Sequence, residues 1–319
     1  MKEKSQFLKS SLWGKYDRYL ILIGFIIISA VLSDKFFTAT NINNLFKQNA
    51  AVGIVAIGEL LVIMTGGIDL SVGAITSMSV VIVALFLQSG LSWPIAAILT
   101  MLIGLAAGTL NGFLITFGRM VPFVVTLATM SIYNGMGLLF SKGRQVFYDN
   151  ANFETIGSLS FGFLPLMAVL WIIVAVICHH LLENTKTGRF IRGVGGNRDA
   201  ARLSGVNVRF TEMLAYMISG LLSGIGGVLM AARLTLGSNS VGSGWELTAI
   251  ASVMIGGGSS VGGVGTVGGV ITGTIIMGLI GNIMNLLKIS IYWQQIIKGI
   301  IILVAVYSST LRELKKEKN

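Results

Sequence analysis

Seven polar side chains lie in stretches that are otherwise apolar, and these are the first candidates for chemistry: Glu59, Thr65, Asp69, Ser71, Asn111, Asn282 and Asn285. A charge in hydrocarbon is costly and needs a partner or a polar cavity. We therefore interpret the seven as candidates for a substrate pathway, and Glu59 as a possible proton carrier. Structural alternatives stay open, because Asp69 could cap the next helix, Glu59 could be a paired packing residue, and the asparagines could join helices. Asn134 and Lys298 are further polar residues in apolar sequence, and Lys298 suits an interface position.

The segment from Ile63 to Ala74 holds three of these candidates. A glycine pair, a lone Asp69 and a serine interrupt sequence that is apolar on both sides, and the next charged residue is Arg119. If the flanks lie in lipid, a helix is broken here near membrane depth, where only protein or a polar cavity can satisfy the freed backbone groups. The segment therefore predicts a hinge beside a transport pathway.

The composition is that of a membrane protein. The chain has 319 residues, of which 54% are hydrophobic and 11% charged, and its mean hydropathy is +0.82; a soluble domain is usually about 25% charged. We predict an all-α, polytopic membrane protein. The single Cys178 excludes an internal disulfide or a cysteine-based metal site, and the adjacent His179 and His180 do not share a helix face, so no metal site is expected.

Uncharged apolar runs predict about ten transmembrane helices, at 19–33, 50–66, 70–91, 93–118, 120–141, 161–182, 213–232, 247–257, 266–287 and 291–310. Residues 41–49 are Asn-rich and are expected to form a polar connection. The eighth run is the least regular, because the Gly-rich stretch 256–265 suits a broken or re-entrant segment. Residues 31–33 make a poor cleavage site, so we expect the first run to be retained as a span.

Glycines with small-xxx-small spacing occur in three of the expected helices. They predict close helix packing in lipid, at Gly104, Gly108 and Gly112, at Gly220 and Gly224, and at Gly265, Gly269 and Gly273.

Charge asymmetry predicts the orientation. Basic residues outnumber acidic ones in the tails at 1–18 and 311–319 and in the loop at 183–212, which has six basic and three acidic residues. The positive-inside rule places all three in the cytoplasm, so both termini of the 19–310 transmembrane domain are cytoplasmic. The net charge of +10 is thus a topology signal, and no nucleic-acid partner is expected. Two halves of five spans would begin on opposite sides, which is compatible with a 5+5 inverted repeat.

The loop at 183–212 is a candidate for docking a partner. Asn197 could cap a short helix at 198–204, which Gly205 would end. Exposed charges beside the apolar Leu203 suit a partner's groove, although a solvated loop is the simpler alternative.

Three motifs, in order along the chain, resemble those of permease subunits of ribose-type ABC importers, a family that handles ribose, galactose, xylose and autoinducer-2. The first is Met64-Thr65-Gly66-Gly67-Ile68-Asp69-Leu70-Ser71-Val72-Gly73. The second, similar to the family's coupling loop, comprises 187–189, 195–197 and 200–206. The third comprises 246–251 with the glycine pairs at 256–257 and 262–263. The resemblance as a whole covers about residues 20–310.

The resemblance implies a pore formed by two copies of the permease or by a related pair, in the cytoplasmic (inner) membrane. An extracytoplasmic substrate-binding protein would deliver a sugar-like molecule, and a cytoplasmic ATP-binding subunit would dock on the coupling loop, at Arg189, Asn197, Arg198, Asp199, Arg202, Leu203, Ser204 and Gly205. ATP would be used by that subunit, so this chain would bind no cofactor. Glu59 departs from the family pattern, where a neutral residue, often an amide, is usual, and this leaves the substrate open to a charged or unusual ligand.

Two other classes of function remain to be weighed. A secondary transporter would move protons through Glu59 and Asp69 without an ATPase. An intramembrane enzyme is disfavoured, because the sequence has no paired nucleophile and base and no phosphate-binding glycine loop.

Overall fold

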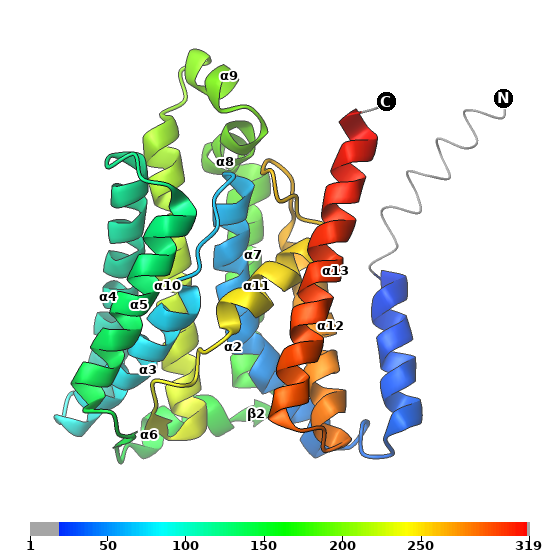
Figure 1. The fold of residues 1–319 in the computed structure, drawn as a ribbon. Coiled ribbons are helices and arrows are strands. Elements are labelled where there is room, and N and C mark those ends of the chain that lie inside the picture. Colours follow the sequence, from blue (N-terminus) through cyan, green and yellow to red (C-terminus); the bar gives the residue numbers. More distant parts are fainter. Residues whose placement is uncertain (1–18, 318–319) are drawn as a thin grey trace.

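The structure, a computed structural model, describes residues 19–317 and is mostly helical (Figure 1). An apolar helix at Tyr19–Leu32 precedes α2 (Ala39–Met64), α3 (Val72–Gln88), α4 (Trp93–Thr116), α5 (Pro122–Ser141), α6 (Ala151–Ser158), α7 (Leu166–Asn184), α8 (Lys186–Gly196), α9 (Arg198–Leu203), α10 (Val208–Leu234), α11 (Trp245–Ile255), α12 (Val267–Leu286) and α13 (Ile291–Glu317). Four two-residue strands form two antiparallel pairs, β1 (Val146–Phe147) with β4 (Leu236–Gly237) and β2 (Ser160–Phe161) with β3 (Leu164–Pro165).

Seven helices in the described part of the chain are long and apolar enough to cross a membrane: α2, α4, α5, α7, α10, α12 and α13. Three apolar helices are shorter, at Tyr19–Leu32, α3 and α11. The prediction of a polytopic, mostly helical membrane protein is therefore confirmed.

The polar connection expected at 41–49 is wrong, because these residues are the first turns of α2. Thr38 caps this helix by accepting a hydrogen bond from the Asn41 amide at 3.4 Å. These asparagines can lie in a helix because their side chains find hydrogen-bond partners on other elements. Asn41 is hydrogen-bonded to Asn282 on α12, and Asn43 donates to Ser160 Oγ at 3.1 Å.

The region 183–212 is helical rather than a loop. The expected capped helix is confirmed as α9, where Asn197 Oδ1 accepts from the Ala200 amide at 2.9 Å and Gly205, at φ 83°, follows its end. The sequence did not predict α8, which is capped by Thr185. Asn207 begins α10 by accepting from the Phe210 amide at 3.1 Å, so α10 starts earlier than its apolar run.

Other boundaries differ where short turns replace expected helix. Residues 160–165 form the β2–β3 pair, so α7 begins at Leu166 rather than near residue 161. The eighth run gives only the short α11, which ends at Ile255 before the Gly-rich residues 256–266.

The helices form a bundle whose two ends differ (Figure 1). The pair α8–α9, residues 186–203, which we call the coupling hairpin, caps one end, and the last residues of α13 lie at the same end. Helix α6 and the short strands lie at the other, which we call the α6 end. The long helices α2 and α10 contact each other and form much of the core, whereas α3 and α11 begin about halfway through the bundle.

Glycine contacts confirm the predicted packing seams. A Cβ added at Gly104 or Gly108 of α4 would overlap the backbone of α10 at Gly220 and Tyr216. A Cβ at Gly273 of α12 would likewise overlap the Ser252 carbonyl of α11. Backbones approach this closely only where both helices present small residues.

Candidate transport pathway and coupling hairpin

The predicted break is present between α2 and α3. Helix α2 ends at Met64, Gly66 takes a left-handed φ of 86°, and the Gly67 amide donates back to the Val62 carbonyl at 3.2 Å. The chain then descends into the bundle before α3 begins at Val72 (Figure 1). Several of the backbone groups freed by the break therefore find hydrogen-bond partners inside the protein, which a break at membrane depth requires.

Four of the seven pathway candidates meet in one buried network. Asp69 Oδ1 accepts from Ser71 Oγ at 2.6 Å and from the Ser71 amide at 2.9 Å. Glu59 Oε1 accepts from the Asp69 amide at 3.1 Å, and Asn111 Nδ2 donates to Ser71 Oγ at 2.8 Å. All four side chains are fully buried. The network ties the break to α2 and α4.

The expectation that Asp69 caps α3 needs correction. The residue in the capping position is Ser71, whose side chain makes no capping bond. Asp69 instead accepts a hydrogen bond from the amide two residues further on, a local turn that short acidic side chains favour.

Glu59 has one carboxyl oxygen outside this network. Its Oε2 is buried and has no hydrogen-bond partner among the described residues.

The other asparagine candidates lie elsewhere. Asn282 Nδ2 donates to Asn41 Oδ1 at 2.7 Å, and the reverse bond measures 3.1 Å, which joins α12 to the start of α2. Asn285 Oδ1 accepts from Gln294 Nε2 at 2.9 Å, which joins α12 to α13. Both residues thus bond helices to one another, the structural alternative that the sequence left open.

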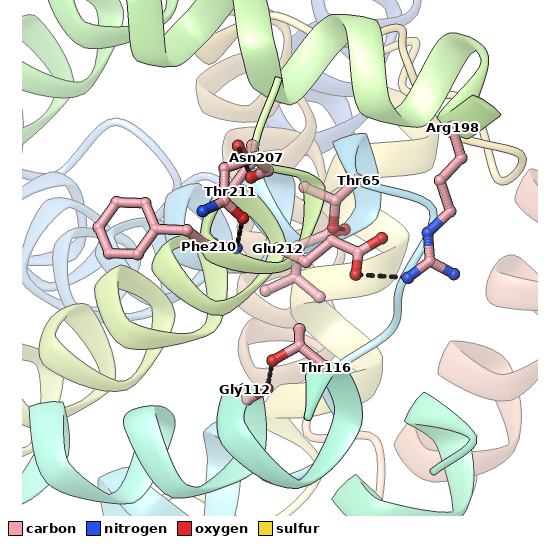
Figure 2. Close-up of polar contacts among 9 residues, drawn as sticks. Thr65, Gly112, Thr116, Arg198, Asn207, Phe210, Thr211 and Glu212 are labelled. Carbon is pink, nitrogen blue, oxygen red and sulfur yellow. Dashed lines mark hydrogen bonds and ion pairs between the residues drawn. The ribbon is translucent and has the colours of Figure 1, made fainter. Parts of the chain in front are cut away.

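A cavity of about 1040 Å³ lies under the coupling hairpin. Thr65 lines it, and so do four of the coupling candidates, Asn197, Arg198, Asp199 and Arg202. Figure 2 shows Arg198 reaching from the hairpin to Glu212 on α10, with an Nη2 to Oε2 distance of 2.9 Å. Because this ion pair fastens α9 to a long helix, movement of the hairpin would be passed to the bundle.

The hairpin also touches the break through backbone atoms alone. The Gly263 amide, in the Gly-rich stretch after α11, donates to the Met64 carbonyl at 2.9 Å. Gly195 of α8 lies directly on this hydrogen bond, since a Cβ there would overlap the Met64 oxygen and the Gly263 nitrogen. Sequence reasoning singled out the glycines at 195–196 and 262–263 as motif residues but missed this contact, because only the folded chain brings the two stretches together.

The outer face of the hairpin is exposed. Leu203 is 86% exposed, and Arg189, Ser204 and Gly205 are also exposed. This face is therefore open to contact from outside the bundle.

A second cavity, of about 540 Å³, lies toward the α6 end; we call it the outer cavity. It is enclosed by the first turn of α3, by α5, and by residues 238–246. The buried Glu246 lines it together with Asn134 and Asn239. None of these belonged to the predicted pathway set. The available signal was that Glu246 is the only charged residue between Arg233 and Lys288.

The turn beside the outer cavity is held by Tyr148. Its hydroxyl donates to the Ala231 carbonyl of α10 at 2.7 Å. Burial, followed by the nearby Glu154, raises the pKa of Tyr148 above its ordinary value. The hydroxyl therefore keeps its proton and its hydrogen bond at physiological pH.

Residues 41–306 match the family described as "Branched-chain amino acid transport system / permease component". The chain belongs to this permease family. The permease is 40% identical to the ribose import permease of Bacillus subtilis, over 92% of this chain and 91% of the relative. The D-allose permease of Escherichia coli is 35% identical, over 95% and 94%. The L-arabinose permease of the same organism is 33% identical, over 98% and 95%.

These relatives confirm the resemblance to ribose-type ABC permeases, and no solved structure matches the permease at a significant level. The permease is a transport protein and not an enzyme, and it is a multi-pass membrane subunit of a bacterial importer. Membership implies an ATPase subunit and a binding protein as partners. Membership of the family favours ATP-driven import over proton-coupled transport through Glu59.

Proposed function

We propose that this permease forms the pathway through which a neutral monosaccharide enters the cell, driven by ATP hydrolysis on a separate subunit. The named cargoes of the three relatives, ribose, allose and arabinose, are all uncharged sugars. Glu59 does not argue for a charged cargo, because its carboxylate is fully buried and bonded to the Asp69 amide.

The coupling hairpin is the proposed docking site for the ATPase, and the exposure of Leu203 is the observation that carries this assignment. On α9, Leu203 projects from the end of the bundle while Arg198 and Ala201 anchor the helix from below. The cytoplasmic side is then the hairpin end, in agreement with the basic residues at 183–212. Ten spans would place both chain ends there, which requires Tyr19–Leu32, α3 and α11 to act as short spans.

The pore itself is proposed to need a second permease copy or a related permease. Helices α5 and α13 bury the smallest share of their surface among the seven long spans, and they are the fifth and tenth spans of the proposed topology. Helices α3 and α11 correspond in the same way, since each is short, follows a long helix and begins about halfway through the bundle. A 5+5 inverted repeat accounts for both pairs.

Within each copy, the pathway candidates take different roles in this proposal. Thr65 lines the hairpin cavity, so it would contact a passing solute. Glu59, Asp69, Ser71 and Asn111 would hold the broken segment in shape from behind. Asn282 and Asn285 would stabilise the outer ends of α2, α12 and α13.

Reconstitution with the ATPase and binding protein tests the proposal. Native permease should take up sugar only with ATP, and Leu203→Asp should abolish both copurification of the ATPase and uptake. Leu203 is too exposed for the change to alter stability by more than about 0.5 kcal/mol. Leu159→Asp is the control, because Leu159 is also an exposed leucine but follows α6 at the other end.

Two results would contradict the proposal. Sugar uptake by the permease alone without ATP would return the function to secondary transport. Normal ATPase binding by Leu203→Asp would move the docking site away from α9.

A further inference from the structure

The outer cavity has the dimensions and lining of a small-molecule site. Its volume of about 540 Å³ lies within the range of roughly 300–1,000 Å³ that such sites occupy. Its lining includes the carboxyl group of Glu246, the guanidinium group of Arg144, the amides of Asn134, Asn239 and Gln145, and hydroxyls of the 238–243 segment. This is an unusual concentration of hydrogen-bonding groups for a chain that is so largely apolar.

The floor of the cavity is rigid. The Gly242 amide donates to Ser77 Oγ of α3 at 2.9 Å. A Cβ on Gly242 would overlap the Gly73 carbonyl, and a Cβ on Gly73 would overlap Glu246 Oε2. The 238–246 segment is therefore seated directly on the first turn of α3, so its polar groups are held in place before any ligand arrives.

Glu246 occupies an electrostatically favourable place. It lies in the first turn of α11 and against Gly73 in the first turn of α3. Two helix N-termini, each carrying partial positive charge, thus face one carboxyl group, which offsets part of the cost of burying it. The oxygens of this group accept hydrogen bonds, so it suits a ligand with several hydroxyl donors.

Asn239 fastens the 238–246 segment to α5. Its Nδ2 donates to the Asn134 carbonyl at 3.2 Å, while its Oδ1 lies against Gly137 of α5. The side chain therefore helps to hold this wall of the cavity in place.

We infer that the outer cavity is a binding site for one neutral monosaccharide, in which Glu246 accepts hydrogen bonds from sugar hydroxyls. This inference rests on the proposed function and adds where the sugar is first held by the permease. The site lies on the side of the break away from the coupling hairpin, so it would receive sugar from outside before the hinge region opens.

Protection of an introduced cysteine tests the site. Because Cys178 is the single native cysteine, a Cys178→Ala background leaves one reactive position. Ser243→Cys places a thiol in the cavity at an exposed position, and Ser158→Cys places one on α6 outside it. The permease–ATPase complex in proteoliposomes, without binding protein, is labelled from outside with an impermeant maleimide.

D-ribose, D-allose or L-arabinose should slow labelling of Ser243→Cys but not of Ser158→Cys. In the Ser243→Cys protein, the additional change Glu246→Gln should raise the sugar concentration needed for half-maximal protection about tenfold, because the sugar loses one charge-assisted hydrogen bond. Asp149→Asn, an exposed acid on the same face and outside the cavity, should leave that concentration unchanged.

The inference is overturned if none of the three sugars protects Ser243→Cys or if both cysteines are protected equally. These failures are distinct from failure of the proposed function. A native complex that imports sugar with ATP while showing no protection retains the function and loses only this site. A complex without ATP-driven uptake loses the function itself.

Discussion

At the scale of single residues, the buried network around Asp69 explains how a polar break is kept in an apolar core. Every bond in it is local or spans adjacent helices, from Glu59 on α2 through Ser71 to Asn111 on α4. Tyr133 of α5 extends the network by donating to Asn111 Oδ1 at 3.3 Å. The network therefore fixes a segment that has no regular secondary structure of its own.

Glu59 should act through its hydrogen bond rather than its charge. Glu59→Gln keeps an oxygen that accepts from the Asp69 amide, so we expect sugar uptake and its pH dependence to be unchanged. Glu59→Leu leaves that buried amide unsatisfied, which should lower the free energy of unfolding by about 1–3 kcal/mol. Uptake in proteoliposomes and thermal unfolding in detergent measure the two effects.

A stable Glu59→Gln protein that has lost uptake would show that the charge itself is needed. In that case Glu59 would regain the proton-carrying role that the sequence left open. The amide variant thus separates a structural acid from a functional one at the same position.

At the scale of elements, several contacts hold the coupling hairpin, and two of them reach α10 and the break; a further ion pair joins Arg192 of α8 to Glu183 of α7. Arg198 binds Glu212 across 14 positions of sequence, and Gly195 packs on the hydrogen bond between Gly263 and Met64. The first contact reaches α10, and the second reaches the ends of both irregular segments. A displacement of the hairpin would therefore act directly on the break between α2 and α3.

Gly195→Ala should uncouple the hairpin from the break. The added methyl overlaps the Met64 carbonyl, so α8 must shift, at a cost of about 1–3 kcal/mol for overpacking. We expect less sugar imported per ATP hydrolysed, with the ATPase still bound through α9. Gly196→Ala is the matched control, because a Cβ there meets open space and alanine is the better helix former. Equal transport by the two variants would refute the contact as the route of coupling.

Hydropathy predicted most of the long helices, because continuous apolar runs are what lipid requires. It failed where polar residues are satisfied by distant partners. The first turns of α2 looked like a connection since the partner of Asn41 lies at Asn282, 241 positions away. Helix α8 and the outer cavity were missed for the same reason: glycine contacts and a lone Glu246 acquire meaning only once the chain is folded.

At the scale of the whole molecule, the two ends of the bundle should face opposite compartments. Cysteines at Ser204 beside the hairpin and Ser158 on α6 test this in intact cells, in a Cys178→Ala background. We expect an impermeant maleimide to label Ser158→Cys at once, and Ser204→Cys only after the membrane is permeabilised. Both positions are exposed, so reactivity reports the side of the membrane. The reverse pattern would invert the topology and place the ATPase site outside the cell.

The contact among Met64, Gly195 and Gly263 has a consequence for how such permeases can diversify. It is made of peptide groups, so it places no demand on side-chain identity beyond the glycines themselves. If the hairpin docks the ATPase as proposed, its exposed residues can change to suit a different ATPase without disturbing this contact. A hairpin transplanted between relatives should remain functional as long as its length, the glycine at this contact and the Arg198 that pairs with Glu212 are kept.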